Sequence, residues 1–158
     1  INKEDIDLAA LLADTMEKMH TVTTTHMISL GENASATVHV DPVLLRQLLR
    51  IFLDNSVKYT PPGGHIRAAS TLSEDGTAVT VTLSDDGIGI APEHQPRIFD
   101  RFYRVDSSRT KETGGSGLGL SIARWIAEQH DITVTLESAV DVGTTITLHI
   151  PTVQPQAK

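Results

Sequence analysis

The chain has 158 residues and a mass of 17.1 kDa, the size of a single domain. Its formal net charge of -7, from 13 basic and 20 acidic residues, argues against a nucleic-acid partner, because binding a phosphate backbone requires a clustered basic surface. Cysteine is absent, which excludes disulfides, thiolate catalysis and cysteine-type zinc sites. No apolar stretch approaches the roughly 20 residues that span a bilayer, so we interpret the chain as an excised cytoplasmic piece of a longer protein.

The first part of the chain predicts two helices separated by short strands. Apolar residues recur at steps of three and four over residues 5–20, which is typical of an amphipathic helix. Residues 26–30 and 36–40 are interpreted as strands. Asp41 and Pro42 then supply an N-cap and a first-turn proline for a second helix that extends to Tyr59.

A β-hairpin is predicted next. Residues 65–72 and 77–84 alternate apolar and polar side chains, and Asp75-Gly76 between them is suited to a turn. Further along, residues 104–116 are polar and without periodicity. We expect either a mobile loop that closes over a site or a plain surface loop.

The last part of the chain predicts a helical patch over 97–102, a third helix over 118–130 and two strands over 133–137 and 145–150. There is no internal repeat and no linker long enough to divide the domain. The seven histidines lack metal-ligand spacing, and we interpret them as scattered surface or strand residues.

One face of the second helix has the composition of a binding site. Ile51, Asn55, Lys58 and Tyr59 share this face, away from the leucine-rich one. An amide oxygen can ligate Mg²⁺, an ammonium group can neutralise phosphate, and an aromatic ring can stack on a base. Solvated or capping side chains near a helix end are the alternative interpretation.

Two glycine-containing motifs follow. In residues 85–89, Asp-Asp-Gly-Ile-Gly directly after a strand, a carboxylate could accept a hydrogen bond from an exocyclic amine, although an acidic turn is the alternative. Residues 114–120 open the third helix, where free N–H groups and the helix dipole favour an anion such as phosphate. They match neither a Walker loop nor a Rossmann fingerprint. Between the motifs, Phe99 and Phe102 are expected to fill the core, and Arg104 could reach a γ-phosphate.

The order of the motifs is more specific than any one of them. Residues 54–61, 85–89, 98–104, 115–120 and 143–145 resemble, in that order, the N, G1, F, G2 and G3 boxes of sensor histidine kinases. The resemblance covers nearly the whole chain. It implies an α/β fold, the two-layer Bergerat sandwich of the wider ATPase superfamily, with a mixed five-stranded sheet, three helices on one face and ATP bound under a lid.

The resemblance also implies a role for individual residues. Asn55 would ligate Mg²⁺, Lys58 would contact phosphate, Tyr59 would lie beside the adenine or ribose, and Asp85 would accept from adenine N6. Thr144 would support Asp85 through water, and Arg104 would be a catalytic contact. The base pocket and the phosphate cradle would be formed by Gly87, Gly89, Gly115, Gly117, Leu118, Gly119 and Leu120.

The implied activity is that of a protein histidine kinase. The domain, residues 1–158, would hold Mg-ATP and transfer its γ-phosphoryl group to a histidine on a separate dimerisation hairpin, within a parent that serves a response regulator. No histidine here has the acceptor setting, so we expect no autophosphorylation from this piece alone, and the parent is expected to be a membrane sensor kinase.

Three departures from the family pattern leave alternatives open. Ile51 stands where the family usually has a first asparagine, and Asp131 and Asp141 replace glycines. A non-catalytic nucleotide-sensing module is one alternative. A gyrase-type or Hsp90-type ATPase is the other, but those enzymes place a glutamate base at the position of Ile51, which cannot activate water.

Overall fold

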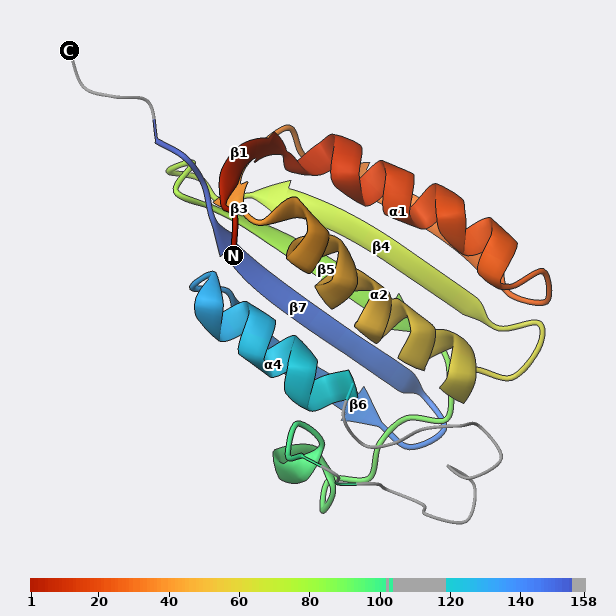
Figure 1. Ribbon diagram of the computed structural model, residues 1–158. Coiled ribbons are helices and arrows are strands. Elements are labelled where there is room, and N and C mark those ends of the chain that lie inside the picture. The colour runs from red at the N-terminus through yellow and green to blue at the C-terminus, as the bar shows by residue number, and fades with distance from the viewer. Residues whose placement is uncertain (102, 104–118, 155–158) are drawn as a thin grey trace.

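The computed structural model describes residues 1–101, 103 and 119–154. These residues form a two-layer α/β sandwich, with a five-stranded mixed sheet behind a layer of helices (Figure 1). The strand order across the sheet is β2–β4–β5–β7–β6. The strands span Met27–Asn33 (β2), His65–Leu72 (β4), Ala78–Asp85 (β5), Thr133–Ala139 (β6) and Gly143–Pro151 (β7).

Three α-helices in the described part of the chain cover one face of this sheet, as the resemblance implied (Figure 1). They are α1 (Leu8–Val22), α2 (Pro42–Tyr59) and α4 (Gly119–Gln129), and a single 3-10 turn, η1, spans Gln95–Arg97. None of the helices described is long and apolar enough to cross a membrane.

Helix α2 lies in the middle of the helical layer, and its sequence explains both of its ends. Asp41 accepts hydrogen bonds from the backbone N–H groups of Val43 and Leu44 at 3.0 and 3.2 Å, which satisfies two of the donors that a helix start leaves free. The hydrogen bond from the N–H of Asn2, followed by these two bonds, lowers the pKa of Asp41. Pro61 and Pro62 then prevent the helix from continuing.

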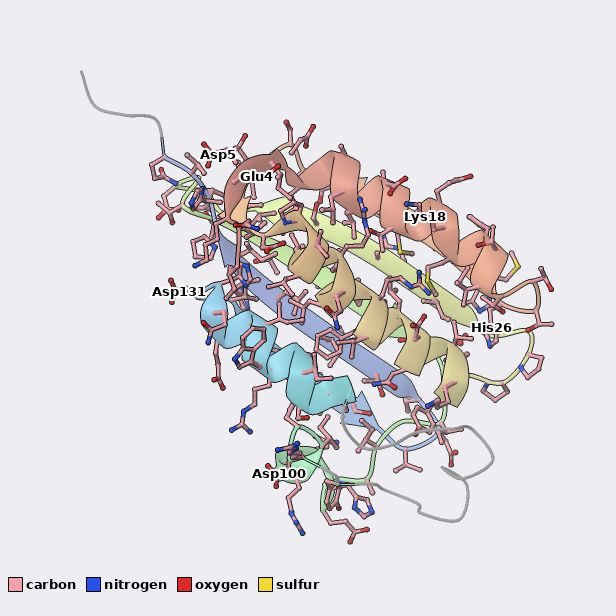
Figure 2. The ribbon with its side chains drawn as sticks, viewed as in Figure 1. Glu4, Asp5, Lys18, His26, Asp100 and Asp131 are labelled. Atoms are coloured by element: carbon pink, nitrogen blue, oxygen red, sulfur yellow. The ribbon has the colours of Figure 1, made fainter. Side chains whose placement is uncertain are left out.

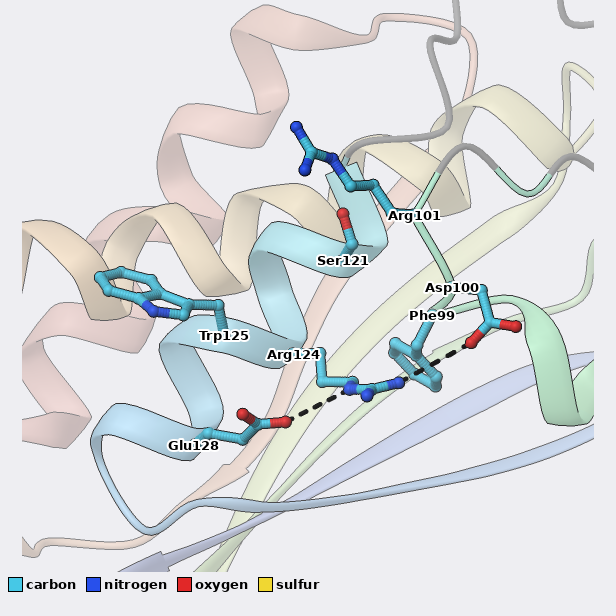
Figure 3. A pocket seen from close by; sticks show the side chains of 7 residues that line it. All are labelled: Phe99, Asp100, Arg101, Ser121, Arg124, Trp125 and Glu128. Atoms are coloured by element: carbon cyan, nitrogen blue, oxygen red, sulfur yellow. Dashed lines mark hydrogen bonds and ion pairs between the residues drawn. The ribbon is translucent and has the colours of Figure 1, made fainter.

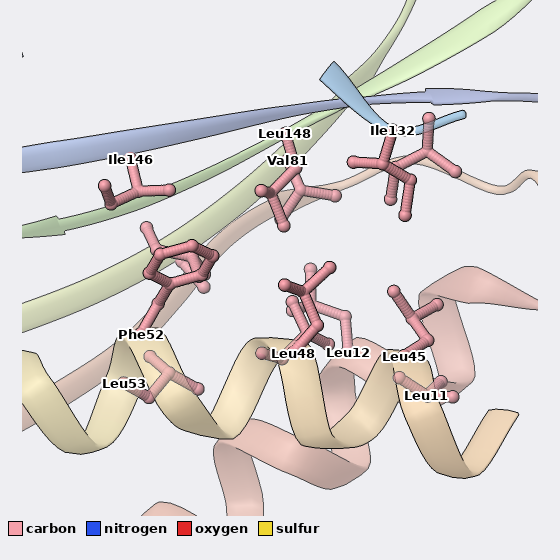
Figure 4. Packing of buried hydrophobic residues seen from close by; sticks show 14 of the residues in the cluster. Leu11, Leu12, Leu45, Leu48, Phe52, Leu53, Val81, Ile132, Ile146 and Leu148 are labelled. Carbon is pink, nitrogen blue, oxygen red and sulfur yellow. The ribbon is translucent and has the colours of Figure 1, made fainter. Parts of the chain in front are cut away.

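The hydrophobic core lies between α2 and the sheet (Figure 4). Leu45, Leu48 and Phe52 point from α2 toward Val81 and Leu148, which lie on the inner face of the sheet. Burying one such side chain contributes about 1.5–3 kcal/mol. The Phe99 ring meets Phe52 edge to face at 6.3 Å, so Phe99 is the packing residue that the sequence predicts. Phe102 lies outside the described residues.

The N-terminal region corrects one prediction. The first helix begins at Leu8 rather than residue 5, because Glu4–Asp7 form a strand, β1, that pairs antiparallel with β3 (Thr37–Val40). Asp7 is the N-cap of α1 and accepts from the backbone N–H of Ala10 at 3.3 Å. The apolar side chain of Ile6 therefore belongs to a strand, although its spacing also fits the helical pattern.

His130 corrects another prediction, because it is buried, with only 5% of its surface exposed. Its Nδ1 lies 2.7 Å from the carbonyl oxygen of Ile126, and its Nε2 lies 3.1 Å from the backbone nitrogen of Asp41. A carbonyl can only accept and an amide N–H can only donate, so the proton is on Nδ1 and the ring is neutral. His130 thus joins the end of α4 to the N-cap of α2.

The predicted helical patch over 97–102 is shorter than expected. The described residues form the single 3-10 turn η1, followed by hydrogen-bonded turns from Asp100 to Arg97 and from Tyr103 to Asp100. Pro96 lies inside η1 and lacks a backbone N–H, which limits regular helix at this point.

Candidate functional site

Of the residues that the sequence singles out, those that the structure describes belong to elements that meet at one end of the sandwich, at the lower right in Figure 1. There the C-terminal ends of α2 and β5 meet the start of β7. Asp85, the last residue of β5, pairs in register with Thr144 of β7, so the G1-like and G3-like segments lie side by side.

The Asp85 carboxylate is held by backbone donors. Its Oδ1 accepts from the N–H of Gly87 at 3.0 Å and from the N–H of Thr144 at 3.3 Å. Thr144 therefore supports Asp85 directly through its backbone, while its hydroxyl lies 2.8 Å from Ser138 Oγ. The role through water stays a prediction. Asp85 is half-buried, and these bonds hold its carboxylate in one orientation. A group that recognises an amine through a hydrogen bond needs such a fixed orientation.

Close approach explains both glycines of the turn after Asp85. A Cβ at Gly87 would lie 2.5 Å from the carbonyl oxygen of Tyr59, and one at Gly89 would lie 2.0 Å from that of Ala139. Gly89 also has a φ of +73°, which other residues rarely adopt. The turn is therefore pressed between the end of α2 and the β6–β7 hairpin. That the two glycines shape a base pocket stays a prediction.

Two side chains that the sequence analysis did not identify hold this turn in place. Ser138 Oγ accepts from the N–H of Ile90 at 2.8 Å, and Gln95 Nε2 donates to the carbonyl oxygens of Ile90 at 2.8 Å and Ser138 at 3.1 Å. Ser138 is 48 residues from Ile90, Gln95 is only five residues from it, and neither belongs to a motif. No linear signal could have identified them.

Asp86, next to Asp85, serves the fold. Its Oδ1 accepts from the backbone N–H of His65 at 2.7 Å, and its Oδ2 lies 2.8 Å from His65 Nδ1. The backbone bond, followed by the side-chain bond, lowers the pKa of Asp86. Of the two neighbouring carboxylates, Asp86 fixes the start of β4 and Asp85 faces the glycine turn.

The polar face of α2 reaches the same end of the molecule. Asn55 and Lys58 are half-buried and Tyr59 is exposed, with Lys58 Nζ 6.0 Å from the centre of the Tyr59 ring. The carbonyl oxygen of Tyr59 accepts from the N–H of Ile88 at 3.0 Å, which connects α2 to the glycine turn. Metal and phosphate contacts of these side chains stay predictions.

Helix α4 starts beside α2. Gly119 is its first residue, and a Cβ there would lie 3.8 Å from Ile51 Cγ2, in ordinary contact. Leu120 packs against the core. Arg104, Gly115, Gly117, Leu118 and the expected loop over 104–116 lie outside the described residues.

A separate hollow of about 400 Å³ lies on the outer side of α4 (Figure 3). Arg124 lies in it, with its guanidinium 3.2 Å from Glu128 and 3.8 Å from Asp100, and Phe99 and Trp125 also line the hollow. The hollow contains neither Asp85 nor the polar residues of α2. It is therefore distinct from the candidate site at the end of β5.

Known proteins resemble the chain over most of its length. The family described as "Histidine kinase-, DNA gyrase B-, and HSP90-like ATPase" matches residues 40–154. The histidine protein kinase SaeS of Staphylococcus aureus is 44% identical over 104 residues, which are 66% of this chain and 30% of SaeS. The sensor histidine kinase YkoH of Bacillus subtilis is 35% identical over 148 residues, which are 94% of this chain and 32% of YkoH.

Among solved structures, full-length ShkA in complex with AMPPNP has a TM-score of 0.82 at 26% identity, covering 99% of this chain and 32% of ShkA. The chain thus spans about a third of the length of these relatives. Family match, sequence identity and fold agree. The chain belongs to the histidine kinase-, DNA gyrase B- and HSP90-like ATPase family, as an ATP-binding catalytic domain of the sensor histidine kinase type.

Proposed function

We propose that this chain binds Mg-ATP and presents the γ-phosphoryl group to a histidine on a separate helical hairpin of its parent kinase. The observation that carries the proposal is the Asp85 carboxylate, which the N–H groups of Gly87 and Thr144 hold in place. It lies beside a turn in which a Cβ at Gly87 or Gly89 would clash with the backbone. A fixed carboxylate is a suitable acceptor for the exocyclic amine of adenine.

The remaining residues would contact different parts of the nucleotide. Tyr59 and the glycine turn would line the base, Lys58 would contact phosphate, and the backbone at Gly119 would face the phosphates from the start of α4. The Asn55 amide oxygen is the donor type that Mg²⁺ prefers. Bound Mg²⁺ would supply charge neutralisation at the phosphates. Arg104, Gly115, Gly117 and Leu118 are proposed to complete this side.

Phosphoryl transfer depends on positioning and on neutralised charge, so this chain needs to supply no nucleophile of its own. The acceptor imidazole would come from the hairpin, and the phosphoryl group would then pass to a response regulator. The curated relatives are about three times as long as this chain, which leaves room for that hairpin and for a membrane-anchored sensor region in a parent of the same kind.

Ile51 argues against hydrolysis as the main activity. It is half-buried, packs against the core and carries no group that can activate water at the position where related ATPases place a glutamate. The same residue favours the second candidate, a nucleotide-sensing module without phosphotransfer, because an apolar side chain cannot order the water shell of a metal.

Calorimetry with ATP and ADP, with and without Mg²⁺, tests the binding proposal, and no saturable binding at millimolar nucleotide would contradict it. Asp85→Asn should weaken adenine nucleotides more than guanine nucleotides, because only the adenine amine needs the carboxylate. Phosphotransfer in the parent kinase separates catalysis from sensing: a parent that binds ATP but never phosphorylates its histidine would favour the sensing module.

A further inference from the structure

Thr60, directly after α2, has a buried side-chain hydroxyl without a hydrogen-bond partner in the described part of the chain. The residue is 3% exposed, and its Oγ1 is the one buried side-chain polar atom without a hydrogen-bond partner among the residues that the structure describes. Its backbone is well held, because the Thr60 carbonyl oxygen lies 2.6 Å from Nε2 of His26, which Figure 2 shows beside the end of α2. An unpaired buried hydroxyl is costly, so its retention calls for an explanation.

The surroundings of Thr60 show where the hydroxyl points. A Cβ at Gly64 would lie 2.2 Å from the Thr60 methyl carbon, so the methyl group faces Gly64. A Cβ at Gly87 would lie 2.7 Å from Thr60 Oγ1 and 3.0 Å from Asp85 Oδ1. The hydroxyl and the carboxylate oxygen therefore border the same small space, which exists because residue 87 is glycine.

The carboxylate can accept a further donor. An ionised carboxylate offers about four lone-pair sites, and Asp85 Oδ1 receives the two backbone N–H groups of Gly87 and Thr144. The Thr60 hydroxyl is a donor that water hardly reaches, so a partner has to come from the wall of the site. The Asp85 carboxylate is an acceptor beside the hydroxyl, because its Oδ1 borders the same space.

We propose that Thr60 is a positioning residue for Asp85, which rests on the function proposed above. When an adenine base occupies the pocket, the turn after Asp85 settles so that the Thr60 hydroxyl donates to the Asp85 carboxylate and holds it aimed at the exocyclic amine. The unpaired hydroxyl destabilises the free chain, and this cost is recovered in the complex. Thr60 thereby lowers the stability of the free domain and raises its affinity for the nucleotide.

The test compares Thr60→Val, Thr60→Ala and Thr60→Ser by calorimetry with Mg-ADP and by thermal unfolding without ligand. Valine and alanine remove the hydroxyl and should weaken ADP about 5- to 10-fold, the effect of one hydrogen bond, while the Tm of free Thr60→Val is equal to or above that of the wild type. Serine keeps the hydroxyl and should restore wild-type affinity.

The matched control is Thr15→Val. Thr15 is 1% exposed and its hydroxyl already donates to the carbonyl oxygen of Leu11 at 2.7 Å, so ADP affinity should not change.

In an Asp85→Asn background, Thr60→Val should cause little further loss, since the two groups act as a unit. The inference is overturned if ADP affinity survives the loss of the hydroxyl in both Thr60→Val and Thr60→Ala, or if the losses from Thr60 and Asp85 add fully. A wild-type domain that binds no ADP would instead overturn the proposed function, and the inference with it.

Discussion

Asp131 and Asp141, the two departures from the family's glycines, both have left-handed backbones, with φ of 55° and 65°. Asp131 follows α4 (Figure 2), where the N–H of Ile132 donates to the carbonyl oxygen of Ala127 at 2.9 Å in the helix-ending motif that favours glycine. Asp141 lies in the β6–β7 turn. Aspartate tolerates this conformation better than most residues, which explains how the fold survives the replacement.

Glycine at either position should stabilise the chain. Asp131→Gly and Asp141→Gly remove the steric cost of a left-handed side chain, and after the added entropy of the unfolded chain a gain of about 0.5–1 kcal/mol remains. The matched variants Asp131→Ala and Asp141→Ala should lower stability by about 1 kcal/mol. Denaturant unfolding measures both, and an alanine variant as stable as its glycine counterpart would contradict the backbone explanation.

Ile51 carries another residue-level prediction. Ile51→Asn should raise the Mg²⁺-dependent affinity for ATP by about 1 kcal/mol if the amide gains one hydrogen bond to a metal-bound water, and leave metal-free binding nearly unchanged. The structure adds a cost, because Ile51 packs against the core and lies close to Gly119. We therefore expect a lower Tm as well. Mg²⁺ titrations of wild type and variant are the measurement, and identical Mg²⁺ dependence would show that Ile51 faces away from the metal.

Motif residues and long-range partners differ in how far the sequence predicts them. The sequence could place Asp85, Gly87 and Gly89 in one turn because a strand, a turn and a carboxylate are neighbours in the chain, and their roles toward a nucleotide stay predictions. Ser138 and His130 could not, because their partners are about 48 and 89 residues away and no periodicity marks them. The unpaired hydroxyl of Thr60 likewise has no sequence signal, since it depends on the packing of the glycine turn.

At the scale of elements, strong local signals predicted α2 and the β4–β5 hairpin nearly to the residue. The caps, the alternation and the turn chemistry all agreed there. The prediction was wrong at β1, a four-residue strand whose partner β3 lies 30 or more residues further along the chain. A strand so short has too little alternation to be distinguished from the helix that follows it.

The turn of the β4–β5 hairpin should make stability depend on pH at the acid end. Asp75 Oδ1 accepts three hydrogen bonds, from the N–H of Thr77 at 3.0 Å, from the hydroxyl of Thr77 at 2.7 Å and from the hydroxyl of Ser73 at 2.8 Å. These bonds lower the pKa of Asp75 to about 2. Because the folded-state pKa lies below that of the unfolded chain, the contribution is complete above about pH 4 and is lost as the pH falls toward 2.

Asp75→Asn is the variant that measures this contribution. The difference in Tm between wild type and Asp75→Asn should be largest above pH 4 and should shrink as the pH falls through the folded-state pKa of about 2. Thr77→Ala removes one donor and should lessen the effect in the same direction. A Tm difference that stays constant from pH 5 to pH 2 would show that the carboxylate is not held by these bonds.

At the scale of the whole molecule, the order of strands in space differs from their order in the chain. Strand β7, the last of the described strands in sequence, lies between β5 and β6 and pairs with both. Its Ile146, Leu148 and Ile150 are buried in the core. The same strand carries Thr144, whose N–H holds Asp85.

During synthesis, β7 therefore leaves the ribosome after both of the strands that it pairs with. Until β7 emerges, β5 has an open edge and β6 has no partner among the described strands. The nascent chain then lacks the core side chains of β7 and exposes the apolar surface that they would cover. A chain that stops at Ala139 should show no cooperative thermal transition and rapid proteolysis, whereas one that stops at Gln154 should fold. Strand β7 completes the sheet and also supplies Thr144, whose N–H holds Asp85, so the core and this part of the candidate site are completed in the same late step.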